Sequence, residues 1–124
     1  ALPISWSKST EVESLRNFTI GIMPLMDDEW AKGKCGFKAL QYLAVGVPAV
    51  VSAVGVNSTI VDHGVNGFVC QDLHDWEAYL TQLLSDRQEV LRLSANARKK
   101  VQERYSVASN KDNFLKIIEL AVRP

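Results

Sequence analysis

The sequence GKCGFKALQYLAVGVPAVVS, residues 33–52, carries the signals of a loop, a helix, a tight turn and a buried strand in succession. Gly46 stands one residue beyond the periodic apolar pattern, where a left-handed helix cap is typical, and Pro48 follows it. Residues 49–51 form a short apolar run with β-branched side chains, which predicts a strand covered on both faces. The helix is expected to bury a stripe at helical spacing made of Phe37, Leu40, Leu43 and Ala44. These elements in this order indicate half of an α/β unit.

Two cations and an amide mark the start of this helix. Lys34, Lys38 and Gln41 lie within a narrow sector of one helix face, at about 100° per residue. The helix dipole and the free N–H groups of the first turn favour negative charge, so a cation there costs roughly 0.3–1 kcal/mol unless an anion binds. One interpretation is therefore a phosphate or pyrophosphate site. The alternative is that the acidic residues 27–29 compensate the lysines and that nothing binds.

A longer segment, residues 33–69, resembles the donor-binding segment of GT-B glycosyltransferases, in particular the large retaining group called family 4 (glycosyl transferases group 1). That family shows a helix end of the type A-x-G-x-P-V-V, then a glycine turn and the run D-G-x-N-G-F. The similarity extends upstream to IGIMPL at residues 20–25 and downstream to Tyr105 and Ser106. The matching positions are Ala44, Gly46, Pro48, Val50, Val51, Gly55, Ile60, Val61, Gly64, Asn66, Gly67 and Phe68. The resemblance implies an α/β fold with a Rossmann-like parallel sheet and flanking helices, as in part of the C-terminal domain of a GT-B enzyme.

The sequence departs from the family pattern at three glutamate positions. The family's two glutamates in the loop and helix fall on Gly33 and Gln41, and Thr59 stands where the later glutamate of E-I-V is usual. The resemblance implies that the second glutamate holds the ribose hydroxyls of the nucleotide and that the first contacts the donor sugar region. Gln41 can still hydrogen-bond a ribose because its amide offers both a donor and an acceptor, whereas Gly33 offers only backbone groups.

The resemblance implies an enzyme, namely part of a retaining glycosyltransferase that moves a sugar from a nucleotide diphosphate sugar to an acceptor. The two lysines and the loop backbone would hold the diphosphate, and Gln41 would face the ribose. The expected substrate-binding residues are Lys34, Cys35, Gly36, Phe37, Lys38 and Gln41. The sequence assigns no catalytic residue, no metal and no cofactor. The alternative is a stand-alone module that binds a nucleotide or a protein partner without catalysis, and the missing glutamates favour it.

The composition fits one globular domain. Hydrophobic residues make up 47% and charged residues 23% of the 124 residues, and the formal net charge of zero gives no reason to expect nucleic acid as a partner. No apolar run approaches the length of a membrane span, and no signal-peptide pattern is present. Cys35 and Cys70 are expected as reduced thiols of a cytoplasmic protein, with Cys35 partly buried and inert rather than reactive. The basic residues 98–100 are expected on a solvated face, with peripheral binding at the inner membrane surface as the alternative.

Residues 1–124 are expected to be a fragment of a nucleotide-sugar-binding Rossmann-like domain, with C-terminal helices from about residue 73. The chain begins with Ala and shows no counterpart of the opening strands of that domain or of the N-terminal domain of a GT-B enzyme. We therefore expect the isolated chain to be inactive. A parallel sheet without its opening strands exposes an edge and apolar helix faces, which predicts self-association into a homo-oligomer.

The other elements are predicted from pattern and capping residues. Strands are expected at residues 3–6, 19–23 and 68–70. A polar loop is expected at residues 26–32, and helices at residues 11–17 and 59–62, from residue 73, after residue 86 and from Ser106. The last helix should carry an apolar side made of Phe114, Ile117, Ile118 and Ala121.

Four polar or aromatic side chains have a functional and a structural interpretation. Asn57 and Ser58 are expected to cap the short helix, although they could also meet a donor. His63 is expected as a turn residue rather than a metal ligand or a base. Trp30 is expected to pack against the domain rather than act as a lid or an acceptor contact.

Overall fold

The computed structural model describes residues 3–122 and confirms the α/β fold with a parallel sheet and flanking helices. In these residues three parallel strands pair in the order β1 (Gly21–Met23), β2 (Ala49–Ser52) and β3 (Gly67–Cys70). The helices are α1 (Glu11–Arg16), α2 (Glu29–Lys32), α3 (Phe37–Ala44), α4 (Asn57–Ile60), α5 (Leu73–Ser85), α6 (Arg87–Arg104) and α7 (Val107–Ala121).

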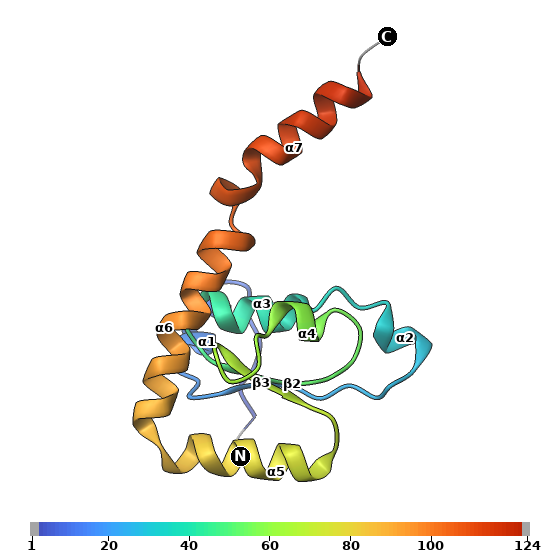
Figure 1. Cartoon of the computed structure of the whole chain (residues 1–124). Helices are drawn as coiled ribbons and strands as arrows, with labels where there is room; N and C mark the ends of the chain where they lie inside the picture. The colour runs from blue at the N-terminus through green and yellow to red at the C-terminus, as the bar shows by residue number, and fades with distance from the viewer. Residues whose placement is uncertain (1–2, 123–124) are drawn as a thin grey trace.

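The sheet lies between two helical layers, as Figure 1 shows: α3 and α4 lie on one side and α5 on the other, while α6 runs along the flank. Neighbouring side chains of β2 point to opposite helical layers, because side chains alternate along a strand. Val51 packs in one core with Leu43 of α3, and Val50 packs in the other with Leu83 of α5. Every residue of β2 is buried, which confirms the predicted strand covered on both faces.

The turn between α3 and β2 confirms the predicted helix cap. Gly46 has a φ of 80°, in the left-handed region that favours glycine. The Gly46 N–H donates to the Leu43 carbonyl at 3.0 Å, and the Val47 N–H donates to the Tyr42 carbonyl at 2.9 Å. This pair of bonds is a Schellman motif, which ends α3 and leads the chain directly into β2.

The predicted buried stripe of α3 is wrong at both ends. Phe37 is 63% exposed and Ala44 is exposed, whereas Ala39, Tyr42 and Leu43 are the buried residues of the helix. The helix contacts both the sheet and α6, so its buried face is centred on Ala39 and Leu43. Phe37 lies in the first turn, where it borders an open depression instead of the core.

Three further local predictions are corrected. Residues 3–6 form no strand: they are exposed and pair with no strand of the described sheet, and residues 4–6 line a pocket together with α1 and Tyr42. The predicted polar loop contains α2, which begins where the Ala31 N–H donates to the Asp28 carboxylate at 2.7 Å. Asn57 does not cap α4 but belongs to it, and its buried amide donates to the Ser52 carbonyl at 3.1 Å.

The C-terminal helices form as predicted, each with a side-chain cap. Asp72, Asp86 and Ser106 accept backbone N–H bonds at the starts of α5, α6 and α7. Figure 1 shows α7 pointing away from the rest of the molecule, and none of its residues from Val107 to Ala121 is buried. No helix within residues 3–122 has the length and apolar character needed to cross a membrane.

Candidate functional site

An open depression of about 650 Å³ lies beside the carboxyl end of β1, where the chain passes from α2 into α3. In parallel α/β sheets, ligands bind at the carboxyl ends of the strands. The structure brings all six predicted substrate-binding residues to this depression, which we call the α3 depression. Its lining residues are Glu11, Met23, Gly33, Lys34, Cys35, Gly36, Phe37, Lys38 and Gln41.

Gly36 shapes the floor of the α3 depression. Its φ of 65° is in the left-handed region, and it occupies the N-cap position of α3. A side chain at this position would also overlap Ile60 of α4, so glycine is required for conformation and for space. Because glycine has no side chain, it leaves the first N–H groups of α3 without the side-chain cap that Asp or Ser usually provides.

The acidic residues just upstream do not neutralise the two lysines of the site. Asp27 and Glu29 both pair with Lys32, at 3.4 and 3.1 Å, and the Asp28 carboxylate caps α2. Within residues 3–122, no carboxylate lies within 4.0 Å of the Lys34 ammonium group. The predicted compensation by residues 27–29 is therefore wrong, and Lys34 borders the depression as an exposed cation.

Glu11 is a site residue that sequence reasoning missed. It comes from α1, and its Oε1 accepts a hydrogen bond from Gln41 Nε2 at 3.1 Å and lies 3.5 Å from Lys38 Nζ. The hydrogen bond from Gln41, reinforced by a hydrogen bond from Trp6 and by the charge of Lys38, lowers the pKa of the Glu11 carboxyl group below its usual value. An ionised Glu11 is thus built into the wall of the α3 depression and partly balances Lys38.

Two side chains near the depression differ from their predicted environment. Trp30 is 81% exposed on α2, so the prediction that it packs against the domain is wrong. Cys35 is exposed rather than partly buried, because it lies in the loop that lines the depression. Cys70, in contrast, is buried in β3, and burial, with the nearby carboxylates of Asp75 and Asp72, raises the pKa of its thiol to about 11.

His63 has a structural role, as predicted for a turn residue. Its Nδ1 accepts the backbone N–H of Val69 at 3.2 Å, which satisfies a donor of the edge strand β3. The ring also packs edge-on against Phe68 and Tyr79, whose own rings are stacked at 4.4 Å. The bond to Val69 occupies the only lone pair of a neutral imidazole at that nitrogen, so Nδ1 is not available to bind a metal.

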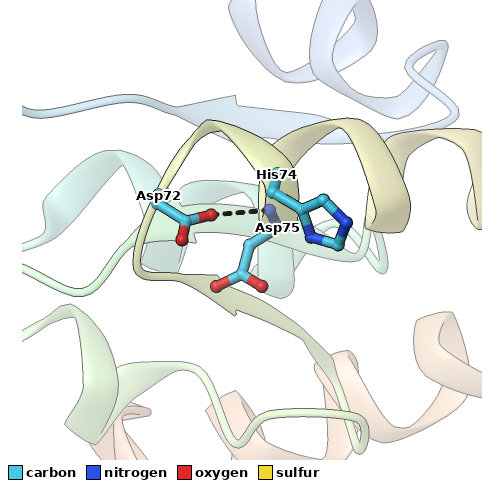
Figure 2. Close-up of side chains that lie close together, drawn as sticks. All are labelled: Asp72, His74 and Asp75. Carbon is cyan, nitrogen blue, oxygen red and sulfur yellow. Dashed lines mark hydrogen bonds between the residues drawn. The ribbon is translucent and has the colours of Figure 1, made fainter.

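A second cluster, Asp72, His74 and Asp75 at the start of α5, has potential metal-ligating atoms within 4.8 Å of one another (Figure 2). Both carboxylates already accept backbone N–H bonds. Asp72 accepts from Asp75 at 3.0 Å, and Asp75 accepts from Gln71 at 2.8 Å. Asp72 thus caps α5, and Asp75 holds the residue just before that cap, which accounts for the proximity of the two carboxylates without a metal.

Comparison with known proteins places the chain in a family. Residues 12–100 match the sequence model of the family described as glycosyl transferases group 1. The chain belongs to this family. A D-inositol 3-phosphate glycosyltransferase of Thermobispora bispora is 43% identical over 65 residues, which are 50% of the chain and 15% of that protein.

Two solved structures show that the fold is shared with glycosyltransferases. A sucrose-phosphate synthase from Thermosynechococcus elongatus matches with a TM-score of 0.68 and 21% identity, over 85% of the chain and 26% of that structure. The C-terminal domain of a glycosyl transferase group 1 family protein from Francisella tularensis matches with a TM-score of 0.69 and 16% identity, over 86% of the chain and 53% of that structure. The group 1 chain thus spans between 15% and 53% of the lengths of these relatives.

Proposed function

We propose that the α3 depression binds the diphosphate of a nucleotide sugar, and that the chain serves as donor-binding part of a retaining glycosyltransferase. The observation that carries the proposal is the position of Lys34. It is a cation without a carboxylate partner in residues 3–122, beside a helix N-terminus that lacks a side-chain cap. Both features favour an anion at the same place, the carboxyl end of a strand. Membership of the group 1 family supports a sugar-transfer reaction.

Each of the six predicted substrate-binding residues has a proposed role. Lys34 and Lys38 bind the diphosphate oxygens together with the backbone N–H groups of Cys35, Gly36 and Phe37. Gln41 lies one turn further along α3 and faces the ribose. When the bond between the sugar and the diphosphate breaks, negative charge develops on the departing oxygen. The lysines and the N–H groups stabilise that charge, which is how fixed dipoles and cations accelerate such a step.

The remaining atoms of the reaction balance without a protein base in this chain. The acceptor oxygen forms the new bond to the anomeric carbon of the sugar, and its proton passes to the departing diphosphate. We propose that a second domain supplies the acceptor side, because the chain spans only part of its relatives. The isolated chain is therefore expected to bind a donor but to transfer no sugar.

Its two unpaired thiols favour a reducing compartment, which supports a cytoplasmic location.

The test is calorimetric titration of the chain with UDP, GDP and ADP. One of them is expected to bind, and the double variant Lys34→Ala, Lys38→Ala should weaken that binding by more than about 100-fold, since charge-assisted hydrogen bonds contribute about 1.5–3 kcal/mol each. The matched control is the double variant Lys99→Ala, Lys116→Ala, which removes the same charge outside the depression. Failure of all three diphosphates to bind, or equal loss in both double variants, would contradict the proposal.

A non-catalytic nucleotide-binding or protein-interaction module is the second candidate. The observation that favours it is the absence of a carboxylate side chain at positions 33 and 41, where the family has glutamates. The two candidates differ in the behaviour of the whole protein. A full-length protein that binds the diphosphate but neither transfers nor hydrolyses the corresponding nucleotide sugar would favour the module.

A further inference from the structure

The hydrogen bond between Glu11 and Gln41 joins two helices across the wall of the α3 depression. The Glu11 side chain is 24% exposed. Its Oε1 accepts the hydrogen bond from Gln41 Nε2 and forms an ion pair with Lys38 Nζ. An ionised carboxylate accepts hydrogen bonds and cannot donate them. The orientation of the Gln41 amide is therefore fixed by chemistry: its NH₂ group must be turned toward Glu11.

We infer that Glu11 is a positioning residue that holds the Gln41 amide with its carbonyl oxygen available to the depression, so that the site selects a ligand that donates hydroxyl groups there. A free amide can present either its oxygen or its NH₂ group. With Glu11 in place, the NH₂ group is engaged and the oxygen Oε1 remains as the acceptor. Gln41 then offers a hydroxyl-bearing ligand the same kind of group that a carboxylate would offer.

The inference rests on the proposed function, because it assigns the selected hydroxyls to the ribose of the nucleoside diphosphate. It also separates two roles on one helix. Lys34 borders the depression as an unpaired cation suited to phosphate, whereas Lys38 is partly balanced by Glu11. Loss of Glu11 should therefore remove the preference for a ribose. The ratio between the affinities of a ribose and a deoxyribose form measures this effect separately from any change in the pairing of Lys38.

Calorimetric titration of the chain with the best-binding ribonucleoside diphosphate and its 2′,3′-dideoxy form tests the inference. The wild-type chain should prefer the ribose form about 10-fold, the effect of one net hydrogen bond. Glu11→Gln should bring the ratio close to one. The double exchange Glu11→Gln with Gln41→Glu should restore the preference for the ribose form. In this variant the amide at position 11 donates to the carboxylate at position 41, and a carboxylate oxygen at position 41 still faces the ligand. Glu13→Gln, an exposed position on the same helix, is the matched control.

Each outcome has a distinct meaning. A ratio that Glu11→Gln leaves unchanged, or a wild-type chain that binds both forms equally, would overturn the role of Glu11 while diphosphate binding stands. No diphosphate binding to the wild-type chain would overturn the proposed function and this inference together.

A measurement without ligand gives a further check. The side-chain NH₂ resonances of Gln41 should shift as Glu11 is protonated, and this shift should vanish in Glu11→Gln. If the Gln41 NH₂ resonances did not respond to the protonation of Glu11, the proposed fixed orientation of the Gln41 amide would be overturned.

Discussion

Lys100 Nζ lies 2.8 and 2.7 Å from the two carboxylate oxygens of Asp62, and this ion pair joins α6 to the segment that follows α4. The Lys100 side chain is 20% exposed and that of Asp62 is 43% exposed. The basic residues 98–100 were expected on a solvated face, but this lysine is engaged within the fold. Its charge is therefore not free to attract an anionic membrane surface.

The Lys100–Asp62 pair should stabilise the fold by roughly 0.5–1 kcal/mol, the upper part of the range for exposed pairs. The measurement is a double-mutant cycle with Lys100→Met and Asp62→Asn, followed by urea unfolding. The control cycle uses Lys99→Met and Glu103→Gln, an exposed pair at 3.9 Å, for which we expect a coupling of about 0.3 kcal/mol or less. Equal coupling in the two cycles would show that the bidentate geometry of Lys100 adds nothing.

The sequence predicted the central fold because its signals are local. Three local features define the turn and β2 without the rest of the chain. They are the left-handed backbone of Gly46, the following Pro48 and the apolar run of the strand. The predictions failed where a distant partner decides the outcome. Residues 3–6 have strand-like composition, but they are exposed and have no neighbouring strand within the described residues. The buried face of α3 likewise depends on α6, a contact that periodicity within α3 does not contain.

The site shows the same limit. Six of its residues lie within eight positions of the sequence, so one loop and the start of one helix were enough to predict them together. Glu11 lies 30 positions from Gln41, and only the packing of α1 on α3 brings the two together. The exposed environments of Trp30 and Cys35 were missed for a related reason. Local sequence does not determine how far the segment that contains α2 and the following loop projects from the core.

The two thiols should differ strongly in reactivity. With a thiol pKa of about 11 and a buried position, Cys70 has a thiolate fraction of about 0.1% at pH 8. Ellman's reagent should therefore modify one thiol per native chain quickly, and the second only after unfolding. Cys35→Ser should remove the fast phase. Because Cys35 lines the α3 depression, a bound nucleoside diphosphate should slow its modification several-fold; two equally fast thiols would contradict this account.

The contribution of Glu11 to stability should depend on pH. Its pKa is lowered in the folded chain relative to the ordinary value of 4.5, first by the hydrogen bond from Gln41, then by the hydrogen bond from Trp6, and last by Lys38. Folding therefore favours the ionised form, and the resulting stability is present above pH 4.5 and is lost as the pH falls through the folded pKa. The difference in urea midpoint between wild type and Glu11→Gln should be clear at pH 7 and should shrink as the pH falls through the folded pKa of Glu11. Glu13→Gln, at an exposed position on the same helix, is the matched control for the loss of one carboxylate.

The exposed apolar side of α7 should make the chain self-associate. Phe114, Ile117 and Ile118 are exposed on one side of a helix that has no buried residue between positions 107 and 121. A single helix of this length is marginal in water by itself, and pairing with a second copy would both cover this side and stabilise the helix. Light scattering at rising concentration should show dimers, and Phe114→Gln with Ile118→Gln should return the chain to a monomer. Leu73→Gln is the matched control, because Leu73 is also an exposed leucine but lies on α5. A wild-type chain that stays monomeric at all concentrations, or dimers that Leu73→Gln disrupts as strongly as the double variant, would show that this side of α7 is not the contact.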